Sequence, residues 1–228
     1  MLLSFQNVSF NYNKSIQALK NITFNLNEGE KVALLGLNGS GKSTLMLQTN
    51  GLLLPSEGNV IVKGMDTRSK SLREIRKIVG LVFQNPDEQL FMHTVKDDVA
   101  FGPRNMKLPE KVIEERVVEA MRVTNTLELS DRHPFDLSGG QKKSVSIATV
   151  LSMRPELIVM DEPTSDLDYK ATNNFIDIAL SLPQAMLIST HDMDLAKKVC
   201  SRAIVLDKGR LIYDGSMQDV RYPEKISG

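Results

Sequence analysis

The sequence has almost none of the residues that build disulfide frameworks or zinc sites. It contains one cysteine, Cys200, and three histidines, at positions 93, 133 and 191. A single cysteine excludes an internal disulfide and is typical of a protein from a reducing compartment. A structural zinc site normally needs four cysteine or histidine ligands close together, so these scattered residues do not favour one.

The sequence also lacks net charge and long apolar runs. Its 28 basic residues balance its 28 acidic residues, so no overall positive field favours a nucleic-acid partner. No apolar run approaches the roughly 18–20 residues that span a bilayer, and the first residues do not resemble a signal peptide. If the protein acts at a membrane, we expect a separate membrane protein to hold it there.

Hydrophobic patterns indicate an α/β fold. Alternating apolar residues near the N-terminus predict antiparallel strands, with a turn at residues 11–14. Continuous apolar runs at 31–36, 78–83, 157–160 and 185–189 predict strands buried on both faces. Helical patterns alternate with the later strands, which predicts a mostly parallel sheet covered by helices. Residues 86–154 have a helical period. We therefore expect one domain, in which residues 1–85 and 155–228 form the core, with an antiparallel β subdomain, and residues 86–154 form a helical subdomain.

Residues 36–43 match the phosphate-binding pattern G-x-x-x-x-G-K-[ST], between a predicted buried strand and a helical stretch. Glycines let backbone N–H groups surround phosphate oxygens, and the start of the helix adds positive potential. Lys42 is expected to reach the β- and γ-phosphates, and the Ser43 hydroxyl to bind Mg2+. A glycine-rich turn with an exposed lysine would match by chance in only about 1% of such chains. The loop residues expected to bind ATP are Gly36, Asn38, Gly39, Ser40, Gly41, Lys42, Ser43 and Thr44.

Two acidic residues, Asp161 and Glu162, stand where an apolar strand ends. Ligands collect at the carboxyl ends of parallel strands, so Asp161 is expected to hold Mg2+ and Glu162 to polarise the attacking water. Alone, the two acids would equally suit a capped turn, but the phosphate-binding loop favours the functional interpretation. Gln84 and His191 follow two other predicted strands, and either could be an ordinary loop residue. Together, the four strand ends predict a site for phosphoryl transfer.

A second predicted anion site opens the helix that begins after Leu137. Ser138 is a favoured N-cap, and Gly139 and Gly140 leave backbone N–H groups free ahead of Gln141. This helix start lies far along the chain from the phosphate-binding loop, in the other predicted subdomain. The separation indicates that it serves the nucleotide of a neighbouring subunit.

In this order, the motifs resemble those of the ABC ATPase family over nearly the whole chain. The resemblance implies that residues 137–141 are the family's signature sequence and that Gln84, as a Mg2+ ligand, belongs to its Q-loop. It also implies that Asp168 lies in the D-loop and that Tyr12 is the aromatic residue that stacks on adenine.

The family resemblance further implies a head-to-tail dimer. Each ATP would lie between the phosphate-binding loop of one subunit and the signature helix of the other, an arrangement that two-fold symmetry closes. Glu162 would then act as the general base, and His191 would contact the γ-phosphate. One residue departs from the family: Ser144 stands where an arginine is usual. Lys142 and Lys143 are the candidates to replace it in placing the signature helix.

Residues 82–91 and 94–103 resemble, more closely, the ATPases of energy-coupling-factor importers. That resemblance implies a peripheral position at the cytoplasmic face of the cell membrane, with a second ATPase, a transmembrane T component and a substrate-binding S component. The substrate would be a metal ion (cobalt or nickel) or a vitamin, and the short tail after the last predicted strand favours the metal ions. Leu90 and Phe91, beside Asp87 and Glu88, would either receive the coupling helix of a membrane partner or belong to the core.

Two other functions stay open at this point. One is a soluble ABC ATPase of DNA repair or translation, against which a single cassette without coiled-coil heptads argues. The other is a regulatory module that binds nucleotide without hydrolysing it. Glu162 and His191 argue against that function, whereas Ser144 is compatible with it. The sequence does not specify the substrate, the identity of the second ATPase or the turnover rate.

Overall fold

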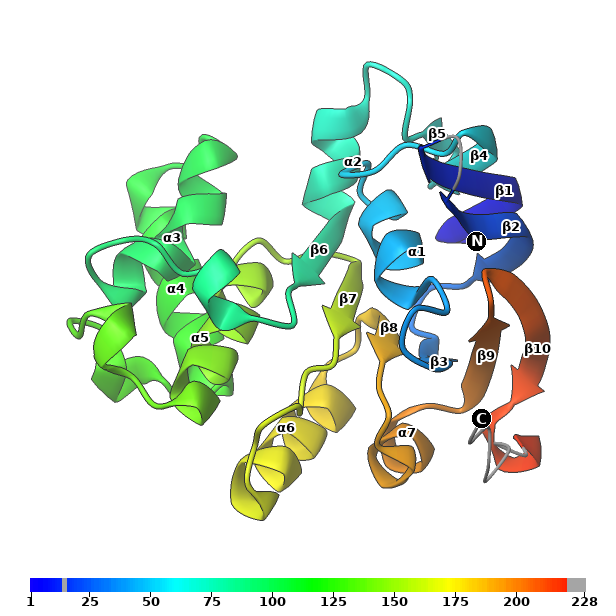
Figure 1. The fold of residues 1–228 in the computed structure, drawn as a ribbon. Coiled ribbons are helices and arrows are strands. Elements are labelled where there is room, and N and C mark those ends of the chain that lie inside the picture. Colours follow the sequence, from blue (N-terminus) through cyan, green and yellow to red (C-terminus); the bar gives the residue numbers. More distant parts are fainter. Residues whose placement is uncertain (14–15, 221–228) are drawn as a thin grey trace.

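Two β-sheets form the framework of the computed structural model, which describes residues 1–13 and 16–220 (Figure 1). The smaller sheet is antiparallel and has the strand order β2-β1-β4-β5. Its strands are β1 (Leu3–Asn13), β2 (Ile16–Leu26), β4 (Glu57–Val62) and β5 (Met65–Asp66).

The larger sheet has six strands in the order β10-β9-β3-β8-β7-β6. All neighbouring pairs are parallel except β9 and β10, which form a hairpin. Its strands are β3 (Lys31–Leu35), β6 (Val79–Val82), β7 (Leu157–Asp161), β8 (Ala185–Ser189), β9 (Arg202–Asp207) and β10 (Arg210–Ser216). Because β3, β8, β7 and β6 are neighbours and parallel, their carboxyl ends meet along one edge of the sheet.

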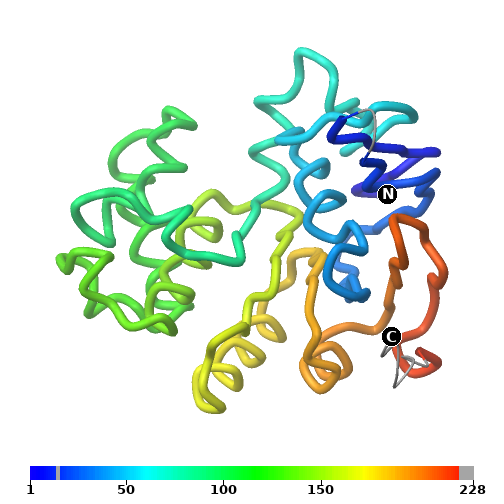
Figure 2. The backbone as a smooth tube through the Cα atoms, viewed as in Figure 1, coloured from blue at the N-terminus to red at the C-terminus, as the bar shows by residue number. Residues whose placement is uncertain are grey.

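The helices fall into two groups. Figures 1 and 2 show α3 (Val95–Asn105), α4 (Glu110–Val123) and α5 (Gly139–Leu151) gathered as a lobe on the β6 side of the larger sheet. The other helices are α1 (Lys42–Gln48), α2 (Leu72–Ile78), α6 (Tyr169–Ser181) and α7 (Met193–Val199). Short 3-10 turns lie at Pro86–Glu88, Leu127–Leu129, Pro134–Asp136 and Met217–Asp219. No helix among the described residues is both long enough and apolar enough to cross a membrane.

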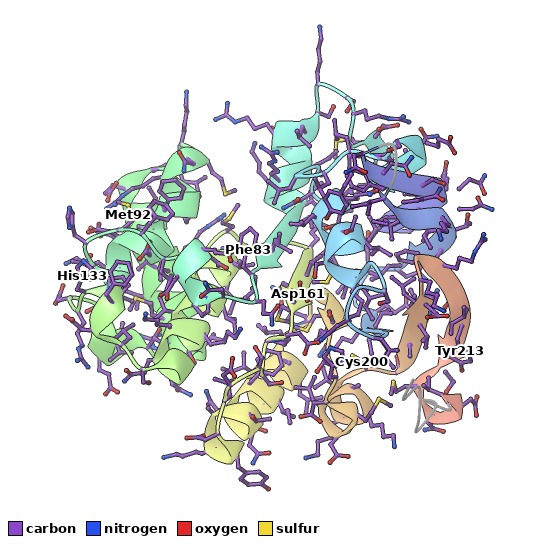
Figure 3. The ribbon with its side chains drawn as sticks, in the orientation of Figure 1. Phe83, Met92, His133, Asp161, Cys200 and Tyr213 are labelled. Carbon is purple, nitrogen blue, oxygen red and sulfur yellow. The ribbon has the colours of Figure 1, made fainter. Side chains whose placement is uncertain are left out.

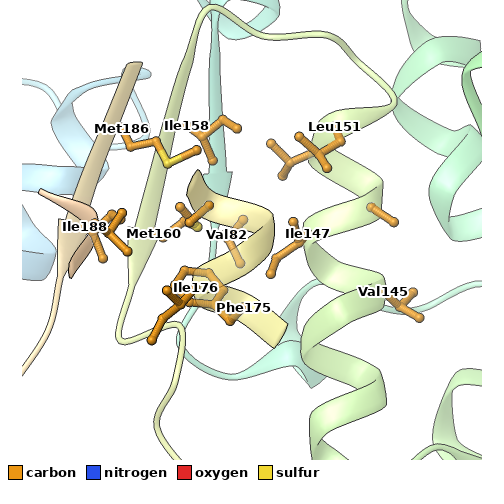
Figure 4. Packing of buried hydrophobic residues seen from close by; sticks show 14 of the residues in the cluster. Val82, Val145, Ile147, Leu151, Ile158, Met160, Phe175, Ile176, Met186 and Ile188 are labelled. Atoms are coloured by element: carbon orange, nitrogen blue, oxygen red, sulfur yellow. The ribbon is translucent and has the colours of Figure 1, made fainter. Parts of the chain in front are cut away.

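The larger sheet buries both of its faces, as its continuous apolar strands predict. On β8, Ala185 and Leu187 pack with the antiparallel sheet and α1, while Met186 and Ile188 pack on the opposite side. Figure 4 shows this second core, in which side chains of α5, α6 and strands β6–β8 interdigitate. The residues drawn there include Val82, Ile147, Leu151, Ile158, Met160 and Phe175. Helix α5 is therefore fixed to the sheet by apolar packing.

The expected fold class is confirmed: an α/β core with an antiparallel β part and a helical part. Two local predictions were wrong. Strand β1 continues through Asn13, so residues 11–13 of the predicted turn belong to a strand, and Lys14 lies outside the described residues. Ile78 ends helix α2, which the sequence patterns did not predict, and β6 begins at Val79. The boundaries expected at residues 85/86 and 154/155 stay a prediction.

Arg202 joins the two sheets. Its guanidinium donates to both carboxylate oxygens of Asp214 at 2.6 and 2.7 Å, to Glu30 at 2.9 Å and to the Asn25 carbonyl at 2.9 Å. These groups come from β10, from the turn before β3 and from β2. The bonds to Asp214, more than those to Glu30, raise the pKa of Arg202, so the guanidinium stays charged.

We expect Arg202→Met to lower the free energy of unfolding by about 1–3 kcal/mol, because charged hydrogen bonds are lost and two carboxylates are left unpaired. Arg210→Met, an exposed arginine on the adjacent strand, should change it by less than about 0.5 kcal/mol. Urea denaturation of the three proteins measures both values. Equal midpoints for Arg202→Met and the unchanged protein would contradict this role.

Candidate functional site

A cleft of about 750 Å³ opens at the edge where the carboxyl ends of β3, β8, β7 and β6 meet. Figure 3 shows Asp161 near the middle of the molecule, and Phe83 at the junction between the helical lobe and the rest. Eleven of the residues predicted from the sequence line this one cleft: Tyr12, Asn38, Gly39, Gly41, Lys42, Ser43, Thr44, Gln84, Asp161, Glu162 and His191. The convergence of four strand ends was predicted, and the sheet order explains it.

The loop before α1 adopts a backbone that only glycine allows at two positions. Gly36 has φ +150°, and a Cβ there would overlap the Leu206 carbonyl oxygen. Gly41 has φ +105°, and a Cβ there would lie 2.7 Å from the Ala18 carbonyl oxygen. The loop is thus held tightly against strands β9 and β2, which leaves its other side open to the cleft.

Lys42 lies over this loop and is only 7% exposed. Its ammonium donates to the carbonyls of Gly36 at 2.7 Å and Leu37 at 3.3 Å. Burial lowers the pKa of Lys42, while the charges of Glu162 and Asp161 act in the opposite direction. The cleft therefore holds a cation whose partners are backbone carbonyls, which an anion can displace.

Ser43 and Asp161 form the contact between α1 and β7. The Ser43 hydroxyl donates to a carboxylate oxygen of Asp161 at 2.7 Å. Asp161 is the last residue of β7 and pairs in register with Ser189 of β8. A hydroxyl and a carboxylate at this distance present oxygen atoms of the kind that hard divalent cations bind.

Glu162 and His191 follow two adjacent strands and contact each other. The His191 Nε2 lies 3.1 Å from Glu162 Oε1, and the His191 backbone N–H donates to Oε2 at 3.2 Å. The same Nε2 lies 3.1 Å from the side-chain oxygen of Asn38, in the phosphate-binding loop. Glu162 has φ +45°, a strained conformation for a residue with a side chain. Strained backbone of this kind is concentrated at functional sites.

Tyr12 and Gln84 both line the cleft. The Tyr12 hydroxyl is 2.9 Å from the Thr44 hydroxyl, and the ring packs edge-on against Phe10 with 4.9 Å between centroids. Tyr12 is 56% exposed, so a face of the ring can still receive a ligand. The Gln84 side chain is exposed to the cleft, and its backbone carbonyl accepts a hydrogen bond from Lys143.

The predicted signature residues lie outside this cleft. Ser138 caps α5 by accepting from the Gln141 backbone N–H at 3.4 Å, and Gln141 accepts in return from the Ser138 N–H at 3.0 Å. Gly139 lines a second groove of about 360 Å³, which also contains Asp166. Asp168 caps α6 by accepting from the Ala171 N–H at 2.7 Å. Gly36 and Ser40 shape the loop but do not line the cleft.

Sequence reasoning missed one wall of the cleft. Residues Gln17, Ala18, Lys20, Lys208 and Gly209 also line it. Lys208 and Gly209 form the turn between β9 and β10, and the Gly209 N–H donates to the Ser40 carbonyl at 3.0 Å while its carbonyl accepts from the Lys20 N–H at 2.7 Å. A turn motif gives no signal for such a contact, because its partner is distant in sequence.

A family model described as "ABC transporter" matches residues 19–165. A putative ABC transporter ATP-binding protein of Geobacter sulfurreducens is 44% identical, over 92% of this chain and 84% of its own length. The energy-coupling factor transporter ATP-binding protein EcfA of Methanocaldococcus jannaschii is 43% identical, over 96% of this chain and 80% of its own.

The solved structures that resemble this chain are also ABC transporter proteins or ATP-binding cassettes. The structure of cbiO1 from Clostridium perfringens, described as part of the ABC transporter complex cbiONQ, matches with a TM-score of 0.86 at 38% identity. It covers 95% of this chain and 89% of its own. A dimeric ATP-binding cassette in a post-hydrolysis state, bound to ADP and Pi, matches with a TM-score of 0.84 at 28% identity, over 95% of this chain and 99% of its own.

We expect Gly41→Ala to weaken ATP binding at least about tenfold. The new Cβ would collide with the Ala18 carbonyl and the Leu19 side chain, at 2.7 and 2.8 Å, and would displace the loop. Calorimetric titration with ATP measures the affinity.

Gly64→Ala is the matched control, because Gly64 has φ +80° but a Cβ added there would meet no heavy atom within 4 Å. It should lose some stability and keep its ATP affinity. Equal affinities for both variants would show that the loop tolerates the shift.

Proposed function

The chain is a member of the ABC transporter family of ATPases, and we propose that it powers an energy-coupling-factor type importer. The observation that carries this proposal is the convergence of the phosphate-binding loop, Gln84, Asp161 with Glu162, and His191 on one cleft. The similarity to EcfA and cbiO1 supports the importer subfamily.

In the proposed binding mode, the phosphates of ATP occupy the loop of residues 36–44. Lys42 would turn from the Gly36 and Leu37 carbonyls toward the β- and γ-phosphates. The backbone N–H groups of the loop and the start of α1 would also bind these negatively charged phosphates. Tyr12, half exposed at the rim, would stack on the adenine ring.

The residues present fit a Mg2+ ion. Ser43, Asp161 and Gln84 supply oxygen donors from one side of the cleft. The described residues contain no group of three or more His, Cys, Asp or Glu side chains that could hold a metal, so the nucleotide's phosphates and waters would complete the coordination, as Mg2+ prefers. When bound, the ion would neutralise charge that develops on the transferred phosphoryl group.

Glu162 is the proposed general base, and His191 is the residue proposed to contact the γ-phosphate. The Glu162 side chain is only 13% exposed, which strengthens its interactions with a positioned water. His191 bridges Glu162 and Asn38, so a phosphate that engaged the imidazole would free the carboxylate to accept a proton from water.

A second ATPase subunit completes the proposed site. Ser138, Gly140 and Gln141 do not line the chain's own cleft, and their helix start carries free N–H groups that suit an anion. A head-to-tail dimer, of two copies or of this chain and a paralogue, would place them on the partner's γ-phosphate. The dimeric cassette among the similar structures supports such an arrangement.

The surface proposed to meet the membrane partner follows Gln84 in the sequence. Leu90 is 2% exposed and belongs to the core, whereas Phe91 is 58% exposed and packs edge-on against Phe101, with 4.9 Å between ring centroids. Asp98 holds the backbone here by accepting from the Phe91 and Met92 N–H groups at 3.0 and 3.1 Å. We propose that this aromatic pair contacts the T component at the cytoplasmic face of the membrane. A separate S component would select cobalt, nickel or a vitamin.

Glu162→Gln should reduce Mg2+-ATP hydrolysis by about 100- to 10,000-fold, because an amide cannot accept the water's proton. ATP should hold this variant as a dimer in size-exclusion chromatography. The exposed Glu128→Gln is the control and should match the unchanged protein. ATP binding without an ATP-dependent dimer would argue against the paired-site mechanism.

Phe91→Ser should leave the basal hydrolysis rate within about twofold, since the side chain is exposed, and should weaken binding to the purified T component at least about tenfold. Tyr169→Ser, on the 83% exposed tyrosine at the start of α6, is the control. Binding assays in detergent measure both. Equal affinities of Phe91→Ser and Tyr169→Ser for the T component would contradict the proposed contact at Phe91.

A further inference from the structure

The two lysines that follow the signature residues both bind the chain's own Q-loop, defined here as residues 83–89. Lys142 pairs with Asp87, with 2.7 Å between ammonium and carboxylate oxygen. Lys143 donates to the backbone carbonyl of Gln84. Neither lysine side chain is therefore directed away from its own subunit, as an arginine that reached toward a partner would be.

A third side chain ties the Q-loop to α5 from the other direction. The Gln89 amide nitrogen donates to the Ser146 carbonyl at 2.8 Å and to the Thr149 hydroxyl at 2.7 Å. Its oxygen accepts from the Phe83 N–H at 3.1 Å. The polar contacts of Lys142, Lys143 and Gln89 thus span the Q-loop and two turns of the helix, and they fix the Q-loop to α5.

Lys143 differs from Lys142 in its surroundings. Lys143 is 3% exposed, whereas the side chain of Lys142 is 16% exposed and that of its partner Asp87 is 49% exposed. Burial lowers the pKa of Lys143, and the charges of Asp166, Asp161 and Glu162 act against that lowering. Lys143 also lines the groove that contains Gln84, Gly139 and Asp166.

We propose that Lys143 is a positioning residue, which transmits the position of Gln84 in one ATP cleft to the signature residues that the same helix offers to the second. The inference rests on the paired-site arrangement proposed above. Lys143 lies about one turn from Gly139 on α5, and an α-helix is rigid over that length. When Gln84 moves with bound Mg2+-ATP, the Lys143 contact moves the start of α5 with it.

With Lys143 in this role, the chain would not need an arginine at position 144. The cation at position 143 acts within the subunit, on the Gln84 carbonyl and the acidic groups around it. Communication between the two ATP sites then depends on a buried intrasubunit contact. Loss of that contact should reduce cooperativity between sites and leave the ATP affinity of a single site unchanged.

The test compares Lys143→Met, Lys143→Arg and Lys142→Met in the purified full chain. Methionine keeps the length of the side chain and removes the charge, so no unpaired charge is buried. We expect Lys143→Met to bind ATP as a monomer within about twofold of the unchanged protein, to lose at least about tenfold in kcat, and to show a Hill coefficient near 1. In the Glu162→Gln background it should lose the ATP-dependent dimer. Lys143→Arg should restore both properties, and Lys142→Met, which removes only the more exposed ion pair with Asp87, should lose less kcat and cooperativity than Lys143→Met.

Unchanged kcat and cooperativity in Lys143→Met would overturn the proposal. If Lys143→Met does not fold, Lys143→Gln decides, because its amide can still donate to the Gln84 carbonyl. That variant should keep the cooperativity, and a folded Lys143→Gln without it would overturn the proposal too. The assay uses ATP alone, so an incorrect importer assignment would leave every one of these outcomes unaffected.

Discussion

The parallel register of β3, β8, β7 and β6 is the constraint on which the rest of the structure depends. Each strand contributes one functional segment at its carboxyl end, and consecutive segments lie on neighbouring strands. The sheet is buried on both faces, so neither its order nor its register can shift without exposing a core. The distances among Ser43, Asp161, Glu162 and His191 follow from that rigidity.

Charge in the centre of the molecule is balanced from two sides. Burial lowers the pKa of Lys42 in the phosphate-binding loop and of Lys143 in the helical lobe, and the charges of Asp161 and Glu162 counteract both shifts. Both lysines are buried, and in both cases the cation is stabilised by backbone carbonyls as well as by distant carboxylates. A nucleotide would bring further negative charge to this region. The arrangement thus links the helical lobe electrostatically to the same acids that the phosphate-binding loop contacts.

The helical lobe has two kinds of attachment to the sheet. Apolar side chains of α5 interlock with β6, β7 and α6 (Figure 4), and polar contacts of Lys142, Lys143 and Gln89 hold the Q-loop to the same helix. The apolar contact resists separation but has no directional preference. The hydrogen bonds are directional, so they define which part of the lobe follows Gln84.

The sequence alone determined the α/β class, the phosphate-binding loop, the four strand ends and the cap at Ser138. These features depend on local chemistry or on a short hydrophobic period, and both can be recognised from residues that are close together in the sequence. Only the tertiary structure decided that Leu90 is core and Phe91 is surface, that the Lys208–Gly209 hairpin supports the phosphate-binding loop, and that Lys143 reaches Gln84. Each of these depends on which distant segments come into contact, and the order of strands in the sheet, not the local pattern, sets those contacts.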